Sequence, residues 1–213
     1  MKIELNLLEN SYDFIINSFE LYSIADECGI HDSQCSSVDN KVKWKLAFIT
    51  MVQAVELLLK EILFRIHPNL IFLNIDFYNK KNLKTVSFQQ AITRVLNFNE
   101  KPIDKEDVKF LINCAKLRNE FIHYKVNIQS EQISPKYSAL HNIYKKLYKE
   151  FFQEEITFVQ QRHQHIEGNI LQFNENMIIY RGFEINKNEA KLIQEELEDN
   201  NKYKFYITID VRR

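Results

Sequence analysis

Glycine and proline are nearly absent from this chain, and their scarcity restricts its fold more than any other feature. The 213 residues contain three glycines and three prolines, the two residue types that interrupt helices most strongly. Hydrophobic residues make up 45% of the sequence and charged residues 27%, which is enough for an apolar core and an ordinary charged surface. The sequence therefore predicts a mainly α protein with long helices.

Apolar residues recur at helical spacing along most of the chain and predict a bundle of four to five helices. The predicted helices are drawn from residues 7–26, 42–66, 88–96, 105–127 and 136–165. After Gly168 the pattern changes: residues 176–185 and 203–211 read as strands, and 188–197 reads as a short helix. We predict a helical domain over residues 1–166 and a small α/β C-terminal extension over residues 167–213.

Composition disfavours several classes of protein. The net charge of -1 provides no general attraction to nucleic acid, so RNA binding would need a local basic patch. The cysteines Cys28, Cys35 and Cys114 show no CxxC or zinc-ligand spacing, which argues against a disulfide framework and a structural metal. The N-terminus lacks an apolar signal segment, and the apolar stretch 46–66 contains charged residues. We expect a cytoplasmic protein without membrane contact, metal or cofactor.

The segment 114–124 concentrates side chains suited to phosphate chemistry. Arg118 stays charged and presents a planar fork that fits phosphate oxygens, whereas His123 can gain or lose a proton near neutral pH. Asn119 precedes His123 by four residues on the predicted helix, so its amide can orient the imidazole. Together these residues favour RNA cleavage.

The helix 105–127 should have an inner and an outer face. On a helical wheel with about 100 degrees per residue, its large apolar residues cluster into a stripe that we predict to face the core. This stripe contains Phe110, Cys114, Leu117, Phe121 and Tyr124. The opposite face carries Arg118, Asn119, Ile122 and His123. Because Ile122 is apolar among polar neighbours, this face would suit contact with a second subunit.

The pattern Arg118-Asn119-x-x-x-His123 resembles the R-[polar]-x(3 to 5)-H motif of HEPN domains, a helical ribonuclease superfamily common in prokaryotic toxin and antiviral systems. In that family an earlier helix often carries an E-x-x-x-K arrangement, which Glu56 and Lys60 match here. The resemblance covers residues 1–166. It implies an up-and-down bundle, a homodimer whose cleft uses the motif helices of both subunits, and metal-independent chemistry.

The resemblance also implies a role for each motif residue. His123 would exchange protons with the ribose 2′-OH or the leaving 5′-oxygen, and Arg118 would stabilise charge on the phosphate. Asn119 would hold the imidazole or a nonbridging oxygen. The residues expected to support the site are Glu56, Lys60 and Tyr124, and the local basic patch expected to bind the RNA substrate is Lys145, Lys146 and Lys149.

The resemblance suggests a toxin or antiphage setting with one departure. Toxins paired with a nucleotidyltransferase antitoxin usually carry a tyrosine two positions after the histidine, where this chain has Lys125, while Tyr124 directly follows His123. Neutralisation by that route is not expected. A protein-binding antitoxin and a sensor or defence partner remain open.

Two other functions stay open at this point. The same helices could form a noncatalytic HEPN-like module that binds a nucleotide or a protein, or a helical adaptor in which Ile122 forms a dimer seam. The remaining histidines predict no metal site. His163 and His165 point apart at spacing i and i+2 and read as surface residues, His31 lacks ligands beyond Cys28 and Cys35, and His67 reads as a helix-end residue.

Overall fold

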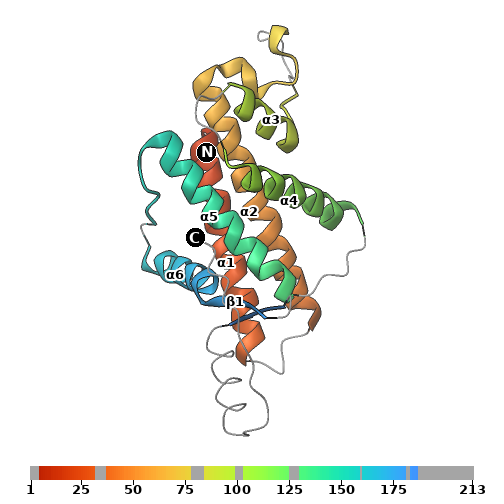
Figure 1. The fold of residues 1–213 in the computed structure, drawn as a ribbon, viewed down its shortest axis with the longest axis vertical. Coiled ribbons are helices and arrows are strands. Elements are labelled where there is room, and N and C mark those ends of the chain that lie inside the picture. Colours follow the sequence, from red (N-terminus) through yellow and green to blue (C-terminus); the bar gives the residue numbers. More distant parts are fainter. Residues whose placement is uncertain are drawn as a thin grey trace, which may run out of the picture. The chain divides into compact units, whose positions relative to one another are not determined.

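The computed structural model describes residues 5–31, 37–77, 84–98, 103–124, 130–158, 160–180 and 183–186. Most of these residues are helical, so the prediction of a mainly α protein is confirmed (Figure 1). The helices are α1 (Leu7–His31), α2 (Ser37–Ile66), α3 (Phe88–Phe98), α4 (Lys105–His123), α5 (Ser130–Phe152) and α6 (Gln161–Asn176), with short 3-10 turns η1 (Pro68–Ile71) and η2 (Ile75–Phe77). Within the described ranges, no helix combines the length and apolarity that a membrane span requires.

Buried hydroxyl groups join the three long helices α1, α2 and α5. Ser11 on α1 donates to the Ala54 carbonyl on α2 at 2.8 Å and lies 3.0 Å from the Tyr144 hydroxyl on α5. The same arrangement recurs seven residues away with Ser18, Ala47 and Tyr137. From the first bridge to the second, the residue numbers increase on α1 and decrease on α2 and α5. α1 is therefore antiparallel to both helices. Seven residues are about two helical turns, which keeps both bridges on one seam.

α2 is the central helix of residues 1–164. It packs against α1 and α5 and also against α3, α4 and η1. Its middle turns, from Met51 to Leu63, are buried almost without interruption. This burial agrees with the apolar circumference of the helix and leaves Glu56 and Lys60 enclosed within the bundle.

The connection between α2 and α3 folds back on itself. The Arg94 guanidinium on α3 donates to the carbonyls of Leu70 and Phe72, both at 2.6 Å. Phe72 also forms an isolated antiparallel bridge with Thr85. These backbone contacts hold Thr85 against the C-terminal half of α2.

α4 crosses α2 obliquely (Figure 1). It begins as predicted at Lys105, where Asp104 is the N-cap and accepts a hydrogen bond from the Glu106 backbone N–H at 2.9 Å. It ends at His123, four residues before the predicted end, because Tyr124 has extended backbone angles. His123 is therefore the last residue of the helix.

The predicted helix 136–165 is two helices. α5 begins earlier, at Ser130, and ends at Phe152; Gln153 follows with φ 58°, the left-handed geometry that often ends a helix. The segment between α5 and α6 then buries Phe158, whose ring lies 4.9 Å from that of Phe19 on α1. Burial of apolar side chains from this extended segment offsets the loss of helical hydrogen bonds.

The chain divides into two compact units, Met1–Gln164 and His165–Arg213. α6 begins at the end of the first unit and is followed in the second by two antiparallel strands, β1 (Met177–Tyr180) and β2 (Phe183–Asn186), with Tyr180 paired to Phe183. The single strand predicted over residues 176–185 therefore corresponds to β1 and the first part of β2. The predicted helix 188–197 and strand 203–211 lie outside the described residues, so the α/β extension stays a prediction.

Candidate functional site

The site begins with a charged pair on the buried helix α2. Lys60 Nζ lies 2.8 Å from Glu56 Oε1, one helical turn away. The two side chains are only 10% and 9% exposed. Lys60 also donates to Thr85 Oγ1 at 3.3 Å. Burial of a charged group is costly unless it has partners, and each of these groups has them.

Arg118 on α4 completes this charged cluster. Its NH1 group donates to Glu56 Oε2 at 2.5 Å, and its side chain is 15% exposed. The two oxygens of Glu56 therefore each bind one cation. The cluster of Glu56, Lys60 and Arg118 holds two positive charges and one negative charge in a largely buried setting, a composition that favours an additional anion.

The remaining contacts of Arg118 limit how it can act. NH2 donates to the Asn119 amide oxygen at 3.3 Å, and the guanidinium carbon lies 5.9 Å from the centre of the Phe88 ring, near the limit of cation–π attraction. The Nε atom is buried and makes no hydrogen bond within the described part of the chain. Arg118 is thus held from several sides, while its buried Nε–H has no acceptor in the described part of the chain.

The inner face of α4 differs from the predicted one. The buried residues are Leu111, Cys114, Ala115 and Phe121, while Phe110 and Leu117 are half-buried. On the same wheel, the centre of this face lies about 90 degrees from Leu117, next to Arg118. The outward placement of Arg118 was therefore wrong. The reason is Glu56 on α2, which supplies a counter-charge for an arginine turned inwards.

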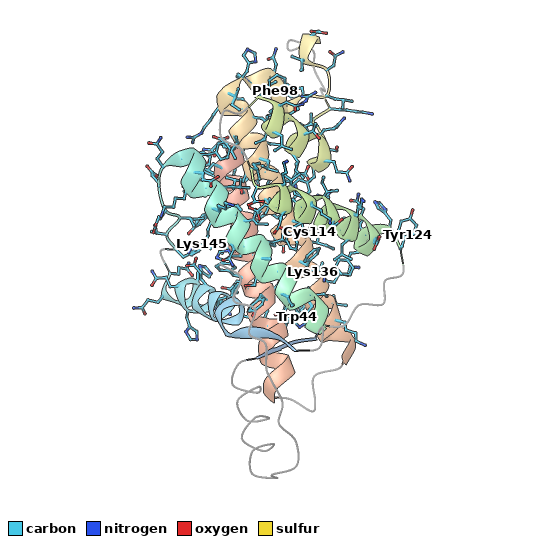
Figure 2. The ribbon with its side chains drawn as sticks, in the orientation of Figure 1. Trp44, Phe98, Cys114, Tyr124, Lys136 and Lys145 are labelled. Carbon is cyan, nitrogen blue, oxygen red and sulfur yellow. The ribbon has the colours of Figure 1, made fainter. Side chains whose placement is uncertain are left out.

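His123 and Tyr124 are exposed at the C-terminal end of α4. Figure 2 shows Tyr124 there, beyond the buried Cys114. The prediction that Tyr124 belongs to the core stripe was wrong, since its side chain is 74% exposed. The rings of His123 and Tyr124 meet edge to face, with centroids 6.5 Å apart.

Arg118 and His123 diverge within one chain. They are five residues apart on α4, which separates them by about 140 degrees around the helix axis. Asn119 lies beside His123 on the exposed face, but the hydrogen bond that its side chain makes within the described ranges is with Arg118. The expected Asn119 contact with the imidazole is not formed.

The predicted basic patch on α5 is partly neutralised. Lys146 lies 2.8 Å from the Asp107 carboxylate, whose hydrogen bond raises the pKa of Lys146. Lys149 lies 2.6 Å from Glu155, whose pKa this hydrogen bond lowers. Lys145 is half-buried on the same helix (Figure 2). The three lysines share one helix, but at least two of them have a carboxylate partner.

The surface prediction for His163 was wrong, whereas the helix-end position of His67 agrees with the structure. His163 is buried, not a surface residue, and its Nε2 lies 2.9 Å from Glu20 Oε1 on α1. Arg162 binds the other oxygen of Glu20 at 2.7 Å. His67 directly follows the end of α2, as predicted for a helix-end residue, and its side chain accepts from the Asn69 N–H at 3.2 Å and so caps η1.

Metal-binding and cysteine chemistry find little support in the described residues. No group of three or more His, Cys, Asp or Glu side chains is arranged there to hold a metal. The side chains of Cys28, His31 and Cys35 lie outside the described residues. Cys114 is a free, buried thiol, and burial raises its pKa to about 12. A thiol of this kind is a poor nucleophile.

Thr85 and Phe88 are parts of the site that could not be predicted from the sequence. Thr85 is 25 residues from Lys60, and no local pattern marks either residue as a partner of a charged group. The fold-back held by Arg94 brings Thr85 to Lys60.

Comparison with known proteins identifies no relative. No protein-family model matches the chain, and no curated protein or solved structure shows significant similarity to it.

Proposed function

We propose that this protein is an endoribonuclease of the HEPN type that cleaves RNA by attack of a ribose 2′-OH. The observation that supports the proposal is the cluster of Glu56, Lys60 and Arg118. The motif resemblance selected these residues on two separate helices, and they contact one another. Asn119 follows Arg118 in sequence and lies with His123 on the exposed face of α4.

The reaction needs a cation for the phosphate and a proton carrier. The 2′-oxygen attacks phosphorus and loses its proton, while the bond to the 5′-oxygen breaks and that oxygen gains a proton. His123 moves one of these protons, and Arg118 stabilises the charge on the phosphate oxygens. The products are a 2′,3′-cyclic phosphate and a 5′-hydroxyl. DNA is not cleaved, because it lacks the 2′-OH.

The divergence of Arg118 and His123 favours a homodimeric site. One phosphate can meet Arg118 of one copy and His123 of a second copy if the exposed ends of their α4 helices face each other. Exposed apolar residues occur where such a contact would form: Val42 and Leu46 on α2, and Ile122 on α4. These two regions are neighbours, because the rings of Phe48 and Phe121 lie 5.6 Å apart.

The proposed cellular role is a toxin or an antiphage ribonuclease in the cytoplasm, controlled by an antitoxin or a sensor partner. This part of the proposal comes from the HEPN resemblance. Lys125, where the tyrosine of nucleotidyltransferase-paired toxins would lie, belongs to the residues outside the structural description. Control by a protein partner fits the sequence better than modification at that position.

Cleavage of total RNA and of purified tRNA in EDTA tests the proposal directly. We expect the wild type to cut and to leave cyclic or 3′-phosphate ends, and we expect Arg118→Ala and His123→Ala to lose about 100-fold or more in rate. Lys116→Ala removes an exposed cation from the same helix, and His165→Ala removes an exposed histidine. Both controls should cut like the wild type. Equal cutting by all four variants would point to a contaminating nuclease.

The second candidate is a noncatalytic HEPN-like module that binds a nucleotide or a protein. The contact between Arg118 and Glu56 favours it, since an arginine engaged by a carboxylate has less freedom to bind phosphate. This candidate predicts a folded wild-type dimer that binds RNA or a partner and does not cut. Product analysis in the same experiment separates the two functions.

A further inference from the structure

Tyr124 is unusually exposed for a large aromatic residue. Its side chain is 74% exposed, more than any other large hydrophobic side chain in the part of the chain that the structure describes. The residue caps α4 with extended backbone angles, φ -130° and ψ 165°, so its side chain leaves the helical surface. Figure 2 shows it at the outer end of the helix. A ring of this size left in water is a common sign of a binding surface.

The surroundings of Tyr124 suit a nucleotide. Its ring lies edge to face with that of His123, with 6.5 Å between centroids. One turn earlier, the oxygen of the Asn119 amide accepts a hydrogen bond from Arg118. Asn119 is exposed, and its amide nitrogen can therefore donate to a phosphate oxygen or a base carbonyl. The end of α4 therefore carries an aromatic ring, an imidazole and an oriented amide donor.

We propose that Tyr124 is a base-stacking platform that selects unpaired RNA for cleavage beside His123. The proposal depends on the ribonuclease function proposed above and adds a specificity residue to it. Proteins that recognise single-stranded RNA stack its bases on exposed aromatic rings. A base stacked on Tyr124 places its own ribose and phosphate next to the adjacent imidazole.

Paired RNA cannot use this platform. Bases inside a duplex are already stacked on their neighbours, and an A-form helix presents mainly phosphates and 2′-hydroxyls to a protein. A protein partner for Tyr124 is the competing interpretation, since Ile122 and Glu120 are exposed on the same end of α4. The contact of the ring with the His123 imidazole favours a nucleotide. The platform therefore predicts a preference for loops and single strands.

Binding of uncleavable RNA tests the platform without relying on catalysis. A fluorescent 2′-O-methyl oligonucleotide, unpaired or annealed to its complement, is titrated into wild type, Tyr124→Leu and Tyr124→Phe. We expect the unpaired form to bind more tightly to the wild type, and Tyr124→Leu to weaken that binding by about 5-fold to 100-fold while duplex binding changes little. Tyr124→Phe keeps the ring and should recover most of the affinity.

Cleavage measured on the same proteins separates this inference from the proposed function. If the wild type binds as expected and does not cut RNA, the platform stands and the ribonuclease proposal fails. If the wild type cuts and Tyr124→Leu has an unchanged kcat/KM and affinity for unpaired RNA, the platform is wrong. Loss of dimerisation by Tyr124→Leu in sedimentation, with RNA affinity unchanged, would instead identify a protein contact and overturn the inference.

Discussion

The Arg118 guanidinium on α4 donates a hydrogen bond to the Glu56 carboxylate on α2 at 2.5 Å, across 62 residues of sequence. The second oxygen of the same carboxylate binds Lys60. A buried carboxylate between two cations is stable only while both cations stay charged and within hydrogen-bonding distance of it. Glu56 thus connects Lys60 on its own helix to Arg118 on α4.

Substitution of Glu56 should destabilise the fold far more than substitution of a similar acid on the same helix. Glu56→Gln leaves Arg118 and Lys60 buried without a counter-charge, and we expect a loss of about 3 kcal/mol in the free energy of unfolding. Glu61→Gln is the matched control. Its partner Arg65, also at i+4, is 54% exposed, so the loss should be below about 1 kcal/mol. Urea unfolding, with an unchanged m-value, measures the free energy of unfolding of both variants. Equal losses of stability in the two variants would contradict the buried cluster.

His123 should affect chemistry without affecting stability. The residue is exposed at the end of α4, so His123→Ala should change the free energy of unfolding by less than about 0.5 kcal/mol. Arg118→Ala removes a buried ion pair, and the expected loss is about 2 kcal/mol because Lys60 still neutralises Glu56. Thermal unfolding of both variants checks this order. A large loss for His123→Ala would show that the imidazole has a structural partner.

Cys114 should make stability depend on pH in the alkaline range. Burial raises the thiol pKa from 9.0 to about 12 in the folded protein. A raised folded pKa favours the protonated, folded form, so this contribution is complete below pH 9 and is lost as pH rises from 9 towards 12. Between pH 8 and pH 10 the wild type should lose more stability than Cys114→Ala. Parallel losses in the two proteins would mean that the thiol is accessible to water.

The thiol of Cys114 should also resist labelling. In a Cys28→Ser, Cys35→Ser background, a thiol reagent at pH 8 should react with Cys114 only after urea is added, because the folded thiol is buried and protonated. Mass spectrometry counts the added label. Fast labelling of the folded protein is the opposing result.

Removal of the carboxylate that pairs with Lys146 should strengthen RNA binding if the α5 lysines contact RNA. Asp107→Asn frees Lys146 from its 2.8 Å partner, and we expect a several-fold gain in affinity with a steeper dependence on salt. Glu155→Gln provides a comparison, since it frees the more exposed Lys149. If affinity and salt dependence are unchanged in both variants, the predicted basic patch does not bind RNA.

Some elements follow from local sequence and others do not. The starts of α1 at Leu7 and of α4 at Lys105 agree with the sequence prediction, since apolar spacing and, for α4, the Asp104 cap are local features. The break between α5 and α6 was missed. It depends on Gln153 in a left-handed conformation, which glutamine rarely adopts, and on burial of Phe158 against a helix from the other end of the domain.

The candidate site, too, could be predicted from the sequence only in part. Arg118, His123, Glu56 and Lys60 could be selected from the sequence because their residue types and spacing are visible in it. The direction of Arg118 could not be, because a helical wheel uses apolar residues to find the inner face and ignores a buried carboxylate on another helix. The exposure of Tyr124 was missed because the helix ends one residue before it.

The sequence alone determined that the chain is helical, since it has few helix-breaking residues and a sustained helical period. It also determined which side chains can perform phosphate chemistry, because that capacity belongs to each residue type. Tertiary structure alone decided which of those side chains meet. Glu56 pairs with Arg118 and not His123 because the crossing of α4 over α2 brings residues 62 positions apart into contact, and the charge balance of such a contact appears only when both helices are packed.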